Sequence, residues 1–367
     1  MKKITFITLH LGYGGVENAL TTLSNSLSNN YEVEIVSVYK RTDSPVFKLD
    51  KNIKLTYLIN HADMKFRHEK NPIKKLFYKI YDNIIEKKLV KKQMKKCDSD
   101  IIISTNLKYN NSMNKFCNKN TTKIFWEHTD PERNKKYIKN VIKSVKNLDY
   151  FVLVSKYLQE FYLEKIHNNK CRCIYIPNAL ESIPDSNLKK DNKSIVTIGK
   201  LSKEKGYVDL IEIFKYVSLK CPDWQLNVIG DGVERDNILD RIKVYKLENN
   251  VILHGFKDKK FINKMLEKSS IYVASSLTDA FGMPILEAFS YGLPCVAFSA
   301  SPGASEIISN NWDGYLIDNL DKEKMAKKII DLIKNENRRI VMGNNAIKKS
   351  LKYSIDIIKE KWLEILN

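Results

Sequence analysis

The chain has 367 residues, of which 43% are hydrophobic, and this is enough for two domains with hydrophobic cores of ordinary size. No apolar run is long enough to span a bilayer, and the amino terminus lacks a signal peptide's long apolar segment and cleavage site, so we expect a cytoplasmic protein. The six cysteines are scattered and no histidines cluster, which disfavours a zinc site or a disulfide framework. The formal net charge of +19 favours an anionic partner, which could be nucleic acid, an anionic membrane surface or a polyphosphate ligand.

The first half of the chain alternates short apolar runs with amphipathic segments. A glycine turn at residues 12–17 follows the first apolar run and continues into an amphipathic helical pattern. The runs predict strands at residues 3–10, 31–39, 53–59, 101–105, 122–126 and 151–155. This alternation is typical of a doubly wound parallel sheet, which we expect as a first domain over residues 1–180.

A polar stretch at residues 181–193 interrupts the pattern and predicts a linker. The alternation then restarts, with strands at 194–199, 225–230, 251–253, 271–274 and 295–298 and helices at 206–219, 233–246 and 259–266. We therefore predict a second, similar domain over residues 194–350, followed by a terminal helix within 351–367. Two such domains would face a cleft with the carboxyl ends of their strands, where α/β proteins bind ligands.

The segment at residues 275–294 begins where a strand ends and continues into a helical pattern. Gly282 would let the backbone approach a ligand closely, and Pro284 suits the first turn of a helix. The amides around this turn would point at a bound anion or hydroxyl group, and they belong to Ala280, Phe281, Gly282 and Met283. Two carboxylates, Asp279 and Glu287, bracket the loop, so a phosphate-bearing sugar would suit it. The alternative is an ordinary helix start with solvated acids beside it.

Two lysines follow the strand predicted at residues 194–199. The loop between Lys200 and Lys205 could return both ammonium groups to one point, where a diphosphate would neutralise them. By itself the segment could equally be a solvated loop in a lysine-rich protein.

These segments together resemble the retaining nucleotide-sugar glycosyltransferases of family 4. Their hallmark is two glutamates separated by seven residues, and here the spacing holds although the first acid is Asp279. In the family the first acid contacts sugar hydroxyls of the donor, and the second, here Glu287, holds the ribose. The family's basic pair, here Lys200 and Lys205, neutralises the leaving diphosphate. Lys200 stands where arginine is usual, which keeps the charge but loses the two-pronged hydrogen bonding.

The resemblance extends to the predicted turns of both halves. The family's glycine turn, whose amides face the donor phosphates and the acceptor, corresponds to Gly14 and Gly15. His128 is similar to the family histidine that lies against the donor sugar, and His10 is a weaker candidate. Turns that cradle the base and ribose correspond to the neighbourhoods of Gly230 and Phe256. The segment Pro302-Gly303-Ala304-Ser305-Glu306 resembles another family element near the same site, and Tyr353-Ser354-Ile355 with Trp362 resembles its closing pattern.

What the resemblance implies is the two-domain GT-B fold, with the terminal helix crossing back to the first domain. It also implies transfer of a hexose or N-acetylhexosamine from a nucleotide donor to a glycan acceptor, with retention of configuration. The expected nucleotide of the donor is UDP. Stabilisation of the departing diphosphate would be electrostatic, and no protein nucleophile is identifiable. Asp98-Ser99-Asp100 has the form of a metal-binding D-x-D, but it precedes an apolar strand, so we interpret it as a turn and expect no metal or other cofactor.

Residues 65–96 explain much of the net charge. Three acids accompany twelve basic residues, which are Lys65, Arg67, Lys70, Lys74, Lys75, Lys79, Lys87, Lys88, Lys91, Lys92, Lys95 and Lys96. Apolar side chains recur among them at helical spacing, namely Ile73, Leu76, Phe77, Ile80, Tyr81 and Ile84. Such a helix could pack its apolar stripe on the core, or bind an anionic bilayer surface. The second interpretation suits a protein on the inner face of the cell membrane that extends lipid-linked glycans, as the family commonly does.

Two other functions are weighed against glycosyl transfer. A basic nucleic-acid-binding protein should interleave basic residues with aromatic stacking platforms in a recognisable motif, and none is found, so we expect no nucleic-acid partner. A sugar-nucleotide epimerase or phosphorylase needs a nicotinamide fingerprint or a pyridoxal lysine, and neither can be located.

Overall fold

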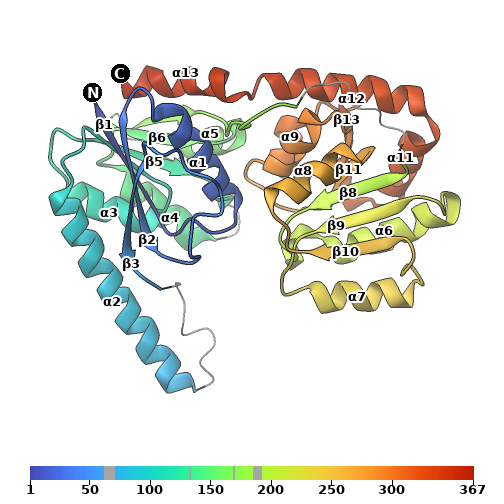
Figure 1. Cartoon of the computed structure of the whole chain (residues 1–367), viewed down its shortest axis with the longest axis horizontal. Coiled ribbons are helices and arrows are strands. Elements are labelled where there is room, and N and C mark those ends of the chain that lie inside the picture. Colours follow the sequence, from blue (N-terminus) through green and yellow to red (C-terminus); the bar gives the residue numbers. More distant parts are fainter. Residues whose placement is uncertain (62–70, 132–133, 168–169, 185–191) are drawn as a thin grey trace. The chain divides into compact units, whose positions relative to one another are not determined.

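The computed structural model describes residues 1–61, 71–131, 134–167, 170–184 and 192–367. The chain forms two compact units, one built from Met1–Ala179 with Ile355–Asn367 and the other from Leu180–Ser354 (Figure 1). Residues 185–191 of the predicted linker lie outside the described residues, as do Lys65, Arg67 and Lys70 of the basic segment.

The first unit is a parallel sheet whose strands, among the described residues, follow the order β3-β2-β1-β4-β5-β6-β7. The strands are β1 Lys3–Thr8, β2 Glu32–Tyr39, β3 Lys54–Ile59, β4 Ile101–Ser104, β5 Thr122–Glu127, β6 Tyr150–Leu153 and β7 Arg172–Tyr175. The helices are α1 Gly15–Leu27, α2 Pro72–Lys96, α3 Leu107–Phe116, α4 Lys135–Val145, α5 Lys156–Leu163 and α13 Ile355–Leu366. The sequence analysis did not predict β7, a four-residue edge strand of which no residue is fully buried.

The second unit repeats the plan, with strand order β10-β9-β8-β11-β12-β13 in the described part of the chain. Its strands are β8 Ser194–Ile198, β9 Gln225–Ile229, β10 Val251–Gly255, β11 Ile271–Ala274, β12 Cys295–Phe298 and β13 Gly314–Ile317. Its helices are α6 Tyr207–Lys220, α7 Arg235–Val244, α8 Lys259–Glu267, α9 Met283–Ser290, α10 Pro302–Ile307, α11 Lys322–Lys334 and α12 Glu336–Leu351. Strand β13, which pairs with β12, was not predicted from the sequence. The strand order reverses between β8 and β11, and ligands of such sheets bind outside the strand ends at this point.

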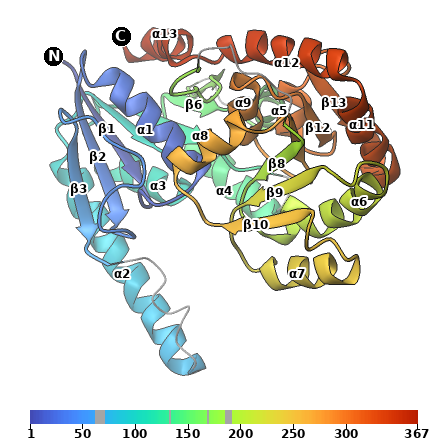
Figure 2. The same ribbon diagram turned by 45° about the vertical axis from the view of Figure 1, so that its right-hand side comes forward.

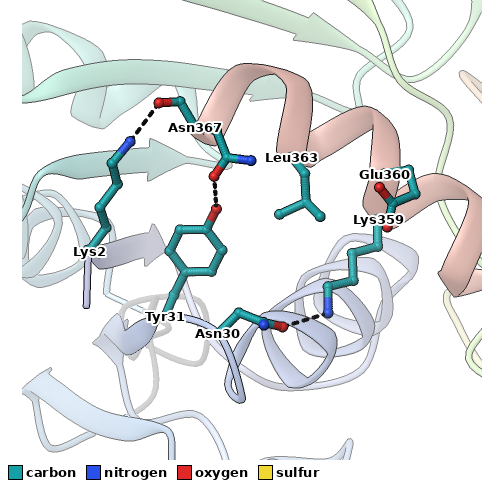
Figure 3. A pocket seen from close by; sticks show the side chains of 7 residues that line it. All are labelled: Lys2, Asn30, Tyr31, Lys359, Glu360, Leu363 and Asn367. Carbon is teal, nitrogen blue, oxygen red and sulfur yellow. Dashed lines mark hydrogen bonds between the residues drawn. The ribbon is translucent and has the colours of Figure 1, made fainter.

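Helix α13 belongs to the first unit, as the predicted fold class requires. Its Trp362 is fully buried and packs edge-on against Trp126 of β5, with ring centroids 4.9 Å apart. Hydrogen bonds join the same helix to the start of the sheet, since Tyr31 donates to Asn367 Oδ1 at 2.7 Å and Lys359 donates to Asn30 Oδ1 at 2.9 Å. These groups line a surface pocket whose polar side chains bond to one another (Figure 3), so the pocket has a structural explanation. The residues that line it are Lys2, Asn30, Tyr31, Lys359, Glu360, Leu363 and Asn367.

Helix α2 extends away from the sheet of its own unit in both views (Figures 1 and 2). Asn71 caps it by accepting hydrogen bonds from the amides of Ile73 and Lys74. Its carboxyl-terminal half is anchored by buried Val90 and Met94. Its other half is exposed along the apolar stripe, for example Ile73 at 79%, and the stripe residues are Ile73, Leu76, Phe77, Ile80, Tyr81 and Ile84. Within the described structure this stripe does not pack on the core. No described helix is both long and apolar enough to cross a membrane.

Candidate functional site

The turns that end β8 and β9 pack backbone against backbone. Gly199 donates its amide hydrogen to Ile229 O at 3.0 Å, and Leu201 donates to Asp231 O at 3.0 Å. Gly230 has a φ of 145°, and a Cβ there would lie 1.8 Å from Gly199 O. Only glycine fits such a contact, so this predicted site residue shapes the edge of the sheet beside the strand-order reversal.

The structure brings Lys205 and Asp279 together at the strand-order reversal, where the loops after β8 and β11 meet. Ser275 Oγ donates to Lys205 O at 2.8 Å and Leu277 N to Glu204 O at 2.9 Å, so the two loops are tied together through their backbones. The Lys205 ammonium then forms an ion pair with the Asp279 carboxylate, and each side chain is about a quarter exposed. By contrast Lys200 is exposed and forms no ion pair with any residue that the structure describes.

The start of α9 presents unpaired backbone donors. The amides of Ala280, Phe281, Gly282 and Met283 have no acceptor within the described residues. Gly282 has a φ of 87°, the left-handed conformation that glycine tolerates best, and it turns the chain into the helix. The side chains of Ala280, Phe281 and Met283 are buried, so only their backbone can reach a ligand. A row of donors at the positive end of a helix suits an anion or a hydroxyl group.

Glu287 lies one turn further along α9, with its side chain only 11% exposed. Its carboxylate forms an ion pair with Lys259 Nζ from the start of α8, a residue that the sequence analysis did not single out. Asp258 caps α8 by accepting from Phe261 N at 2.8 Å, and the helix predicted at 259–266 already placed Lys259 at the helix start. Its pairing with Glu287, 28 residues away, has no local signal in the sequence. Phe256, after the end of β10, is 47% exposed, as a surface for stacking requires.

Arg235 is a second residue that sequence reasoning missed. It begins α7, and its Nη1 is buried without a hydrogen-bond partner among the described residues. A Cβ built on Gly255 would lie 3.9 Å from this nitrogen, so the guanidinium lies beside the end of β10. Nearby, His254 Nε2 is 2.8 Å from Asn227 Oδ1, and burial together with Lys257 lowers the pKa of this histidine. The imidazole therefore supports the strand end as a neutral group.

In the first unit, the Glu17 carboxylate lies against the backbone of the glycine turn that follows β1. His10 Nδ1 lies 3.1 Å from both Gly12 N and Glu17 Oε1, so it accepts from the first or donates to the second according to its protonation. A Cβ on Gly14 would lie 2.1 Å from Glu17 Oε2, whereas none of the surrounding atoms comes within 4 Å of one on Gly15. Open space is therefore found at Gly15. Roles for Gly14 and Gly15 in binding phosphate stay predictions.

His128 follows β5 and is held there by Glu127. The Glu127 carboxylate accepts from the amides of His128 and Thr129, at 2.9 and 2.8 Å, and from the Tyr137 hydroxyl at 2.7 Å. Burial raises the pKa of Glu127 to about 7 and lowers the pKa of His128 to about 3, so the imidazole is neutral at neutral pH. Its Nε2 is buried without a hydrogen-bond partner in the described part of the chain. A neutral ring with this unpaired nitrogen suits a hydroxyl group better than a phosphate.

Asp98-Ser99-Asp100 has a structural role. Asp100 accepts from the Lys3 amide at 2.8 Å, and Asp98 pairs with Lys3 Nζ at 2.5 Å, at the amino end of β4. The interpretation as a turn accounts for both acids. The described residues contain no group of three or more potential metal ligands.

The chain is similar to known proteins in sequence and in fold. Residues 179–349 match the family model described as glycosyl transferases group 1. An uncharacterized glycosyltransferase of Haemophilus influenzae is 28% identical over 100% of both chains. An N-acetyl-D-galactosaminyltransferase of Campylobacter jejuni is 26% identical over 100% of this chain and 98% of its own. Among solved structures, S. aureus TarM superposes with a TM-score of 0.83 over 100% of both chains at 19% identity, which shows a shared fold.

The two parallel α/β units define the GT-B fold. Residues 179–349 belong to the group 1 glycosyltransferases, also called family 4, and the protein is an enzyme of the hexosyltransferase type. The predicted family, fold class and enzyme class are therefore confirmed.

Proposed function

We propose that the protein transfers a hexose or N-acetylhexosamine from a UDP-sugar to a glycan acceptor, with retention of configuration, in the synthesis of a surface polysaccharide such as capsule or O-antigen. The observation that carries this proposal is the loop at the strand-order reversal of the second unit. There a lysine–aspartate pair, a row of unpaired amides and a buried glutamate lie on consecutive turns. A nucleotide sugar would use all three: the lysine and the amides suit its diphosphate, the aspartate suits its sugar hydroxyls, and the glutamate suits its ribose.

The proposed roles follow from the chemistry of each group. Lys205, with Lys200, offsets the negative charge that grows on the diphosphate as the glycosidic bond breaks, and the amides at Ala280 to Met283 add to this stabilisation. Asp279 accepts hydrogen bonds from the transferred sugar. Glu287 accepts the ribose hydroxyls, while Gly230 and Phe256 lie against the nucleoside.

We further propose that the first unit, over residues 1–180, receives the acceptor. Neutral His128 would accept or donate a hydrogen bond at a sugar hydroxyl. In the turn that contains Gly14 and Gly15, the open side of Gly15 would allow a close approach of the backbone. In support, the name of the Campylobacter jejuni relative describes an acceptor that is linked to PP-undecaprenol, which is a lipid. TarM and a second similar structure, Anabaena HepE, were crystallised with UDP.

Binding to a panel of nucleotide sugars tests the proposed reaction. A ligand at 100 times its dissociation constant stabilises the folded state by about 2.7 kcal/mol, so the matching UDP-sugar should raise the melting temperature measurably. Other nucleotides should have smaller effects at the same concentration. Retention on nucleic acid that decreases with salt, without stabilisation by any nucleotide sugar, would instead favour the nucleic-acid-binding alternative.

The exposed stripe of α2 supports a proposed location on an anionic membrane. Phe77 is 64% exposed and Ile80 is 51% exposed, and lysines on neighbouring turns surround them. Apolar groups of this kind enter the boundary between lipid headgroups and chains, and each nearby basic residue contributes about 1 kcal/mol of attraction.

Two variants of α2 test the membrane location. Replacing Lys74, Lys75 and Lys79 together by glutamate should abolish sedimentation with vesicles that contain phosphatidylglycerol, because the surface attraction changes sign with the charge. Replacing Phe77 and Ile80 together by serine should weaken binding to the same vesicles, while the dependence of this binding on salt should stay unchanged.

The matched control reverses three exposed lysines of the second unit, Lys243, Lys348 and Lys352, which changes the net charge equally. This control should bind as the parent does. If the α2 lysine variant sediments like the parent, or if the control loses binding as fully, then α2 is no membrane-binding element.

A further inference from the structure

Lys259 has no role in the proposed reaction, yet it contacts Glu287, the residue proposed to bind the ribose. It is the first residue of α8, and the Asp258 cap fixes the direction in which this helix begins. From there its ammonium reaches the Glu287 carboxylate on α9, which lies 28 residues further along the chain. The Lys259 side chain is about one-third exposed, whereas that of Glu287 is 11% exposed. The pair therefore lies at the edge of the site, with the carboxylate on the inner side.

Physical chemistry gives this pair a consequence for nucleotide binding. A largely buried carboxylate is costly unless it is paired, and it turns toward whatever donor or solvent is in reach. A nucleoside diphosphate also brings further negative charge, which repels an uncompensated carboxylate nearby. An ammonium bonded to one carboxylate oxygen reduces both effects, and it fixes the plane in which hydroxyl groups can donate to the carboxylate.

We infer that Lys259 is a positioning residue for the nucleoside half of the donor, holding the Glu287 carboxylate oriented toward the ribose. The inference rests on the proposed function of Glu287. It distinguishes Lys259 from Lys205, because Lys205 serves the diphosphate whereas Lys259 acts through Glu287. The effect of Lys259 should therefore depend on the ribose hydroxyls and should disappear when Glu287 is absent.

Calorimetric titration with UDP, 2′-deoxy-UDP and inorganic pyrophosphate tests this. In Lys259→Ala we expect the affinity for UDP to fall about 10- to 100-fold, as for truncation of one partner of a buried charge pair. The affinity for pyrophosphate should change less than about 2-fold, since it lacks the ribose. The preference for UDP over 2′-deoxy-UDP should shrink. Lys259→Arg should recover most of the loss, because arginine keeps the charge and the hydrogen bond.

Lys260→Ala is the matched control, since Lys260 is the exposed neighbour in the same helical turn and its loss changes the net charge equally. It should bind all three probes as the parent does. In a Glu287→Ala background, Lys259→Ala should weaken UDP binding by less than about 2-fold further, because coupled residues lose their effect together. A full additional loss would contradict the inference.

The charge-swapped double variant, Lys259→Glu with Glu287→Lys, separates positioning from stability. It can restore an ion pair and the melting temperature, but it moves the carboxylate to α8, so UDP binding should stay weak. UDP affinity equal to the parent's in this variant, or in Lys259→Ala, would overturn the inference. If the parent itself binds no UDP but binds another nucleoside diphosphate, the titrations are repeated with that nucleotide and its 2′-deoxy form. If it binds none, the proposed function fails.

Discussion

Replacing Lys205 by alanine is expected to lower kcat by about 10²- to 10³-fold, the loss typical of removing one preorganised stabilising group from an active site. The effect on the KM for the donor should be much smaller, because the diphosphate gains negative charge as the glycosidic bond breaks. The variant also leaves the partly buried Asp279 carboxylate without its ammonium partner. Steady-state kinetics with the donor identified by the nucleotide-sugar panel measures both constants.

Lys203→Ala provides the control for this prediction. Lys203 lies in the same short turn but is exposed, so its replacement should leave both constants nearly unchanged. Lys200→Ala should also reduce kcat, with a smaller effect than Lys205→Ala, because Lys200 is exposed and no ion pair with the described residues fixes its position. If Lys205→Ala raises KM and leaves kcat intact, this lysine only holds the bound donor before reaction.

Replacing Glu287 by alanine should weaken binding of UDP itself. A carboxylate that accepts two ribose hydroxyls makes charge-assisted hydrogen bonds of roughly 1.5 to 3 kcal/mol each, so their loss should reduce affinity by about 10²- to 10⁴-fold. The Lys259 ammonium would also remain beside the site without its carboxylate. Calorimetric titration with UDP measures the loss.

Glu248→Ala serves as the control, since Glu248 is an exposed acid of the same unit and lies outside the proposed site. It should bind UDP with the parent's affinity. A folded Glu287→Ala variant that binds UDP as tightly as the parent would remove Glu287 from the proposed site.

Much of the fold could be predicted because its signals are local. Buried parallel strands such as β1 and β11 are short apolar runs, and their ends differ from the predictions by no more than two residues. The short edge strands β7 and β13 were not predicted, because an apolar run of three or four residues does not by itself distinguish a strand from part of a helix. The apolar stripe of α2 shows the opposite limit. Its helical spacing was evident, but spacing cannot tell whether the stripe meets the core or the solvent.

The candidate site likewise has some features that the sequence shows and others that it does not. The spacing of Asp279 and Glu287, the glycine at position 282 and the lysines of the loop after β8 are visible along the chain, because each is a matter of a few neighbouring residues. The resemblance to family 4 rests on the same local segments. These features were sufficient to predict the family and the fold class correctly.

Only the tertiary structure decided which of these residues meet. Lys205 and Asp279 are 74 residues apart, and they pair because the strand order places β8 beside β11. Lys259 and Glu287 are 28 residues apart, on α8 after β10 and on α9 after β11, so they meet only when the strands of the sheet have paired. Glu127, buried behind His128, has no local signal at all. A sequence pattern reports the period of burial within one element, whereas such contacts depend on strand order and side-chain direction, which arise only when the elements pack.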